Sequence, residues 1–194
     1  MRCAGSWRTR RSSQTDVHLP THVLSGWVVA CAVPELTPRE RMLAMAAATS
    51  PDLDGLAIIA GRDAFETYHH VIGHNLFFGL LVTLLVVRWS THKRTMTLLA
   101  FGLFHLHLVM DSFGSGCDWG ISYLWPLLQR EWMNPWRWEF FSWQNLVAAY
   151  GLLLVTIVIA ARQGRTPLEV LAPSLDRQLV GLAQRLWPRR KPIS

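Results

Sequence analysis

Charged residues are scarce in this sequence. They make up 16% of the chain, compared with roughly 25% in soluble domains, while 51% of the residues are hydrophobic. The only cysteines are Cys3, Cys31 and Cys117, and no two of them form a CxxC pair. This scarcity excludes a disulfide framework and a strong thiolate metal site. The N-terminal arginines are not followed directly by an apolar stretch, so we do not expect a cleaved signal peptide.

Tryptophan, in contrast, is abundant. Most of the 10 Trp residues lie between apolar runs, as is typical of side chains at a bilayer interface. The net charge of +6 comes from basic residues that flank apolar segments. This pattern favours anionic membrane lipids as partners and argues against nucleic acid, which would require a basic stripe with interleaved aromatics.

Several apolar segments have the length or periodicity of helices. We expect short helices over 22–33 and 38–49, membrane helices over 74–89, 95–110 and 143–161, and a basic amphipathic helix from about residue 174. The sequence thus predicts an all-α, multi-pass membrane bundle of about five helices plus an amphipathic C-terminal helix. We expect a disordered basic arm over 1–19, a membrane-embedded metal-site domain over 20–162 and a basic amphipathic tail over 163–194.

A histidine cluster stands at the start of the third apolar segment. His69, His70 and His74 precede an uncharged run, and clustered imidazoles are most often metal ligands. His70 and His74 would share one face of a helix, whereas His69 and His74 converge only if the chain turns, which Gly73 permits. The alternative is a polar cap at the membrane surface.

Carboxylates occur in two further places. Asp52 and Asp54 alternate in a Pro/Gly turn, where both could reach one cation, although an ordinary Asx turn has the same pattern. His107 and Asp111 are four residues apart and share a helix face, so they could chelate a metal, or Asp111 could orient His107. His105 lies about 200° around that helix from His107, which favours a hydrogen-bonded core or interface histidine.

The order of the helices also places the candidate ligands together. If the helices alternate in direction, His22 begins the first, the Asp52 turn follows the second, His74 begins the third and Asp111 ends the fourth. All of them then lie at one end of the bundle.

Basic residues gather at the opposite end, which predicts a cytoplasmic C-terminus and a site on the outer face. The arginines of the N-terminal arm oppose this orientation.

These motifs, taken in order, resemble a known family. They are His22, Pro51-Asp52-x-Asp54, His69 and His74 before an apolar helix, His107-x-x-x-Asp111, and Trp125-Pro126-Leu127. The order is similar to that of the LexA-regulated, membrane-bound metal-dependent hydrolases, the YdjM-like family of unknown substrate. This chain has His70 where the family has Arg, and Gly73-His74-Asn75 where it has Thr-His-Ser. The resemblance implies His22, Asp52, His69, His74, His107 and Asp111 as the metal set, with His70 as the alternative to His69 and Asp54 as ligand or general base.

The resulting hypothesis is a metal-dependent hydrolase in the inner (cytoplasmic) membrane of a bacterium. Its cofactor would be a divalent metal, with zinc first and manganese, magnesium or iron as alternatives. Asp54 or Asp52 would accept a proton from water, and the substrate would be a small or lipid-like molecule, such as a phosphoester. A metal-binding or metal-transporting membrane protein is the main alternative, and a haem-binding electron carrier using His105 or His107 is another.

Overall fold

The computed structural model describes residues 19–116 and 120–187, which form a bundle of helices. The elements are α1 (Leu19–Cys31), α2 (Pro38–Thr49), the 3-10 helix η1 (Ser50–Ala60), α3 (Arg62–Tyr68), α4 (Leu76–Arg88), α5 (Lys93–Gly114), α6 (Trp143–Gln163) and α7 (Pro173–Leu186). No strand occurs within these ranges, apart from an isolated antiparallel bridge between Ile121 and Trp132. The prediction of an all-α bundle with a separate C-terminal helix is confirmed. The predicted arm over 1–19 lies outside the described residues except for Leu19, which begins α1.

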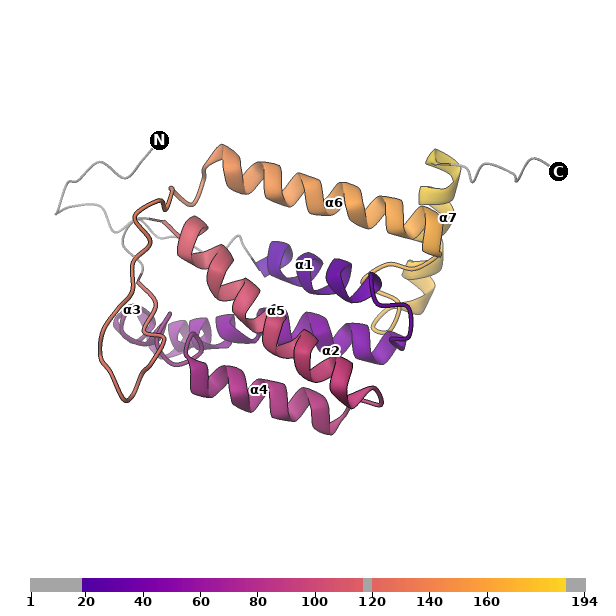
Figure 1. The fold of residues 1–194 in the computed structure, drawn as a ribbon. Coiled ribbons are helices and arrows are strands. Elements are labelled where there is room, and N and C mark those ends of the chain that lie inside the picture. The colour runs from indigo at the N-terminus through magenta and orange to yellow at the C-terminus, as the bar shows by residue number, and fades with distance from the viewer. Residues whose placement is uncertain (1–18, 117–119, 188–194) are drawn as a thin grey trace.

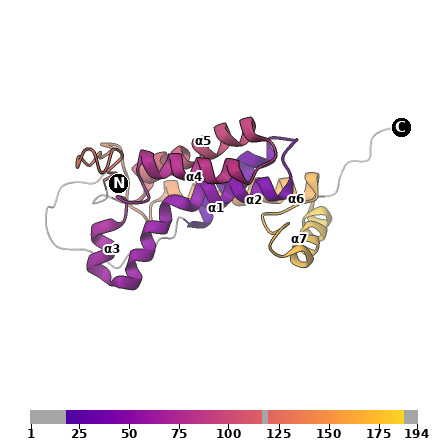
Figure 2. The ribbon, with the colours of Figure 1, turned by 90° about the horizontal axis from the view of Figure 1, so that it is seen from below.

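Successive helices reverse direction, as the sequence predicts. The turns that join α1 to α2 and α4 to α5 lie at one end of the molecule, and α3 and the connection from α5 to α6 lie at the other (Figure 1). Seen from below, η1 and α3 fold back on each other and stand out from the bundle (Figure 2). One end of the bundle therefore contains four helix termini, namely the start of α1, the end of α2, the start of α4 and the end of α5.

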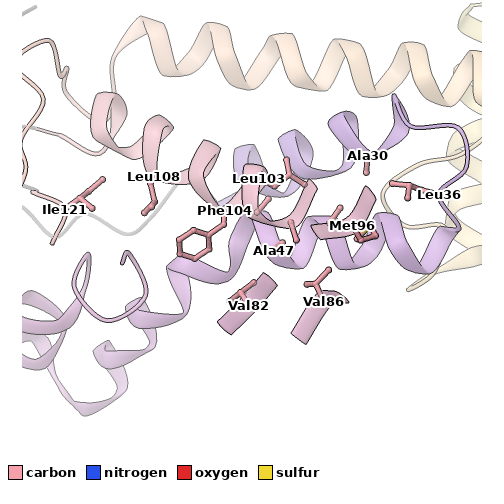
Figure 3. Packing of buried hydrophobic residues seen from close by; sticks show 13 residues of the cluster. Ala30, Leu36, Ala47, Val82, Val86, Met96, Leu103, Phe104, Leu108 and Ile121 are labelled. Atoms are coloured by element: carbon pink, nitrogen blue, oxygen red, sulfur yellow. The ribbon is translucent and has the colours of Figure 1, made fainter. Parts of the chain in front are cut away.

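Small residues allow α1 and α2 to approach closely. A Cβ atom on Gly26 would lie 2.7 Å from the Cβ of Ala48 and 3.0 Å from the backbone oxygen of Ala44. Such close helix contacts are typical of membrane bundles, where van der Waals packing replaces the hydrophobic effect. Side chains of α1, α2, α4 and α5 then meet in one core, which includes Ala30, Ala47, Val82, Met96 and Phe104 (Figure 3).

Three segments are long and apolar enough to cross a membrane. They are Pro38–Ala60, Lys93–Gly114 and Trp143–Gln163. Helices α1 and α4 have 13 residues each, which gives a length of about 20 Å against a hydrocarbon thickness of about 30 Å. These two helices are therefore too short to span the bilayer alone, which corrects the expectation of a membrane helix over 74–89. α4 packs on the bundle through Gly79, Val82 and Val86 and leaves Leu80 and Leu84 exposed on its other face.

The first carboxylate segment differs from the sequence prediction. We expect Ser50-Pro51 to stop the second helix and Asp52 and Asp54 to lie in a turn, but the chain continues as the 3-10 helix η1. Proline is tolerated here because the first turn of a new helix does not need its N–H. The Ser50 hydroxyl donates to the Ala47 carbonyl at 2.9 Å and replaces the backbone donor that Pro51 lacks. Asp52 and Asp54 therefore stand on a helical extension of α2.

Charged residues at the other end of α2 tie it to distant segments. Glu40 is buried, forms the predicted capping box with Thr37, and accepts from the backbone N–H groups of Thr91 and His92 at 2.9 and 2.8 Å. Arg41 donates through two nitrogens to the two carboxylate oxygens of Glu169, both at 2.6 Å. These bonds attach the α1–α2 hairpin to the α4–α5 turn and to the connection that follows α6.

Candidate metal centre

Four acidic and imidazole side chains from three segments converge at the end of the bundle that carries α3. They are Asp52 of η1, His74 of the turn before α4, and His107 and Asp111 of α5, and one ligand atom of each lies within 4.8 Å of the others. His74, His107 and Asp111 are buried, and Asp52 is partly exposed. The shared end that helix alternation predicts is therefore confirmed for these four residues.

The distances among the four ligand atoms are short. His107 Nε2 lies 3.0 Å from Asp111 Oδ2 and 3.3 Å from Asp52 Oδ1. His74 Nε2 lies 3.2 Å from Asp111 Oδ2, 4.0 Å from Asp52 Oδ1 and 3.3 Å from His107 Nε2. Ligands bonded at about 2.0–2.2 Å to one tetrahedral ion stand roughly 3.3–3.6 Å apart. Four of these five distances lie within about 0.3 Å of the separation that such an ion requires, and the fifth, between His74 and Asp52, is longer at 4.0 Å.

The partners of the other ring nitrogens fix the tautomers of both histidines. His107 Nδ1 lies 2.7 Å from the Ala48 carbonyl oxygen, which can only accept, so Nδ1 carries the proton. His74 Nδ1 lies 3.0 Å from Asp54 Oδ2, so it carries a proton for the same reason. In the neutral rings, both Nε2 atoms then direct a lone pair toward the shared space, as metal-ligating histidines do.

Asp54 lies behind His74 and contacts three donors. Its Oδ1 lies 2.7 Å from His69 Nδ1. Its Oδ2 accepts from the backbone N–H of Gly73 at 2.9 Å and faces His74 Nδ1. With both oxygens engaged in this way, Asp54 holds the orientation of His74. His69 stacks on Phe65 with a centroid distance of 4.6 Å.

The histidine segment adopts the turn that the sequence leaves open as the alternative to a helix. The residues from His69 to Asn75 form turns rather than a helix, so His70 and His74 do not share a helix face. His70, not Gly73, adopts the left-handed conformation, with φ of 64°. Gly73 is needed for space instead, because a Cβ atom there would lie 2.1 Å from the Pro51 carbonyl oxygen. Asn75 closes the turn by accepting from the N–H of Phe78 at 2.9 Å, which caps α4.

His22 and His70 border the centre without joining the four-atom group. His22 Nε2 lies 3.1 Å from Asp111 Oδ1, and its ring stacks on His107 with a centroid distance of 3.7 Å. His70 Nε2 lies 3.9 Å from Asp111 Oδ2. Of the eight predicted ligands, Asp52, His74, His107 and Asp111 thus form the inner group. His22, His69, His70 and Asp54 surround it, and their assignment as ligands stays a prediction.

Burial acts on the two histidines that lie in the turn outside the spanning helices. It lowers the pKa of His70 well below the ordinary imidazole value, and the neighbouring His74 and His69 add to this effect. Burial also opposes ionisation of His74, but hydrogen bonds to Asp111 and Asp54 outweigh it and raise the pKa of His74. His70 is therefore kept neutral, whereas the two carboxylates favour positive charge at the position of His74.

The donor set fits a divalent cation. Two imidazole nitrogens and two carboxylates suit zinc and also accommodate manganese or iron. Asp52 Oδ2 is buried and has no hydrogen-bond partner among the described residues, and an unpaired buried carboxylate oxygen is costly unless a cation or water satisfies it. One oxygen of each carboxylate also lies within 4.8 Å of an oxygen of the other, and a positive ion between them would offset their repulsion.

His105 lies apart from this centre. Its Nδ1 lies 2.8 Å from the Phe101 carbonyl oxygen and its Nε2 lies 2.9 Å from the Tyr123 hydroxyl. This confirms the expectation of a hydrogen-bonded histidine, and it gives both ring nitrogens partners other than a haem iron. The Ala48 carbonyl, which orients the His107 ring, could not be predicted from the sequence. It is a backbone group, and every residue type carries one.

Comparison with known protein families identifies the family of this chain. A family model described as "YdjM inner membrane protein" matches residues 17–187. The matched range contains all eight predicted ligands and each described helix. No curated protein and no solved structure matches the chain.

Proposed function

The chain belongs to the YdjM inner membrane protein family, and on that premise we propose that it is a metal-dependent hydrolase embedded in the inner membrane. The observation that carries this proposal is the convergence of two imidazole Nε2 atoms and two carboxylates within 4.8 Å. Asp52, His74, His107 and Asp111 would hold the metal, with zinc as the first candidate. When bound, a divalent cation supplies Lewis-acid activation of water and of the scissile ester.

The residues around the four ligands would fix their chemistry. The Ala48 carbonyl and Asp54 keep the protons of His107 and His74 on Nδ1, which leaves both Nε2 atoms available as ligands. His69 and the Gly73 N–H hold Asp54 in place. Partners of this kind raise the basicity of the ligands and prevent the rings from turning.

Proton acceptance is assigned to Asp52. A general base needs an oxygen that can take a proton from water in the site, and Asp52 Oδ2 has no hydrogen-bond partner among the described residues. The alternative base that the sequence suggests, Asp54, uses both oxygens to contact His69, Gly73 and His74. This contrast favours Asp52 as the base and Asp54 as a positioning residue.

The proposed substrate is a lipid-like ester, such as a phosphoester at headgroup depth. The segment between α5 and α6 presents several exposed apolar side chains, namely Leu127, Trp132, Trp136 and Phe141. It is fastened beside the site, because the Ser122 N–H donates to the His70 carbonyl at 3.3 Å and the Trp138 N–H to the Phe113 carbonyl at 2.8 Å. Exposed Trp side chains suit the membrane interface, so a substrate held in the bilayer would lie near the centre.

Metal analysis of the purified protein tests the first half of the proposal. We expect the wild type to bind a divalent metal, and His74→Ala and Asp111→Ala to lose it. His105→Ala is the matched control, since it removes an imidazole from the same helix as His107 but outside the centre. If His74→Ala and Asp111→Ala retain the metal, these residues do not form the proposed metal centre.

Hydrolysis of lipid esters by the purified protein tests the second part of the proposal, its enzymatic activity. The wild type in vesicles should release product from ester-containing lipids, and Asp52→Asn, which can still coordinate through one oxygen, should retain metal but lose most of the activity. Metal binding without hydrolysis of any phosphoester or acyl ester lipid would instead favour a metal-binding or metal-transporting membrane protein.

A further inference from the structure

Helix α7 lies at the end of a membrane-crossing helix. α6 has 21 residues, which gives a length of about 31 Å and matches the hydrocarbon thickness of a bilayer. A short connection over 164–172 follows it, and α7 then runs across the end of α6 rather than along it (Figure 1). If α6 crosses the membrane, α7 lies at the level of the lipid headgroups, at the end of the bundle opposite the metal centre.

Several contacts fix which side of α7 faces the protein. Ala183 is buried against Ala160 and Ala161 of α6. Asp176, in the first turn of α7, accepts from the backbone N–H and the hydroxyl of Thr166, both at 2.7 Å. The paired Arg41 and Glu169 hold the connection that leads into α7. The rotation of α7 about its own axis is therefore set by the protein itself.

This rotation leaves a row of leucines uncovered. They follow the spacing i, i+4, i+7, i+11, which places them on one helix face. Their exposed fractions are 44% for Leu175, 38% for Leu179, 53% for Leu182 and 72% for Leu186. Arg177 and Arg185 are exposed on the remaining surface. A contiguous apolar strip with a basic flank marks an interaction surface rather than an ordinary solvated face.

We propose that α7 is an interfacial anchor, with its leucine row inserted at the acyl boundary of an anionic leaflet and Arg177 and Arg185 on the lipid phosphates. Two observations favour a membrane over another protein. A short connection joins α7 to α6, whose own Leu153, Leu154 and Ile157 are exposed as lipid-facing side chains are. The charge beside the row is basic, which complements anionic headgroups. The inference does not depend on the proposed function, because α7 contributes nothing to the metal centre.

Spin labels on the full-length chain in lipid nanodiscs test this placement. In a background with the native cysteines replaced by alanine, one label goes on Leu179→Cys and the control on Gly181→Cys. The two positions lie about 200° apart around the helix, and a Cβ on Gly181 meets nothing within 4 Å. In nanodiscs containing phosphatidylglycerol, the ratio of oxygen to nickel-chelate accessibility should be about fivefold higher or more at residue 179 than at residue 181.

Each other outcome would overturn the inference. Equal nickel accessibility at both positions would mean a solvated helix, and protection of residue 179 from both reagents would mean a protein cover, such as a second copy of the chain. The anionic preference is tested separately with Arg177→Gln/Arg185→Gln and with phosphatidylcholine nanodiscs. Both changes should bring the label at residue 179 closer to water, and an unchanged depth would refute the assignment of the arginines to lipid phosphates.

Discussion

Replacing Gly73 with alanine should separate the histidine turn from the helix that carries the carboxylates. The added Cβ would lie 2.1 Å from the Pro51 carbonyl oxygen and 3.1 Å from Cγ of Asp54. A carbon atom and a carbonyl oxygen normally stay at least about 3.3 Å apart, so the two backbone segments must move apart by roughly an ångström. His74 lies on one of these segments and Asp52 on the other.

The cost follows from the kind of atom that obstructs the new methyl group. Overpacking a close contact costs about 1–3 kcal/mol, and the upper value applies here because a backbone oxygen cannot swing away as a flexible side chain can. For a chain of this size, about 3 kcal/mol corresponds to a melting temperature lowered by roughly 6–12 °C. Metal affinity should also fall, because a shift of roughly an ångström is large compared with metal–ligand bonds of about 2.0–2.2 Å.

Thermal unfolding and metal content of the purified protein measure both effects, and Gly102→Ala is the control. Gly102 lies in α5, the helix of His107 and Asp111, and a Cβ there meets nothing within 4 Å. That variant should be as stable as the wild type or up to about 1 kcal/mol more stable, because alanine is the better helix former. If Gly73→Ala melts and binds metal as the wild type does, the contact between the turn and η1 does not support the site.

Further predictions concern the cation, the backbone, a buried ion pair and the orientation. Chelator should lower the melting temperature and added zinc or manganese should restore it, because the clustered carboxylates repel each other without a cation; no response to either would indicate a polar core held by hydrogen bonds alone. His70→Gly should be about 1 kcal/mol more stable than His70→Ala, because both remove the imidazole but only glycine adopts a φ of 64° without strain; the reverse order in denaturant unfolding would contradict the left-handed turn. Glu169→Ala should destabilise the protein by about 3–5 kcal/mol in the same measurement, because it leaves the buried Arg41 without its partner; a loss below about 1 kcal/mol would mean that the pair is solvated. A C-terminal reporter that is active only in the cytoplasm should give a signal, because the basic turns lie at the α7 end; activity of a reporter that works only outside would place the metal centre on the cytoplasmic side.

Helix positions could be predicted from sequence because apolar length and proline placement dominate them. The second helix covers residues 38–49 in the prediction and in the structure, and Thr37 and Glu40 form the predicted capping box at its start. The 3-10 helix that follows could not be predicted in the same way. Ser50-Pro51 indicates a stop, and only the tertiary structure reveals that Ser50 supplies the missing hydrogen bond and that the chain continues as a helix.

The candidate site was predictable in its residue types but not in their roles. Asp52 and Asp54 look equivalent in sequence, yet one points into the group of four and the other supports His74 from behind. That division depends on which ring nitrogen faces which partner, and spacing along the chain does not determine it. The close contact between Gly73 and Pro51 could not be predicted from the sequence either, because it joins two backbone segments that are far apart along the chain.

The ion pair between Arg41 and Glu169 has a consequence for the order in which this protein is made. The two residues are 128 positions apart, so at roughly 5–20 residues per second the ribosome reaches the glutamate about 6–26 s after the arginine. During that interval Arg41 has no carboxylate partner from the connection after α6, and its guanidinium keeps the Leu36 carbonyl as an acceptor. The ion pair that attaches the α1–α2 hairpin to the end of α6 can therefore form only after the last membrane segment has been made.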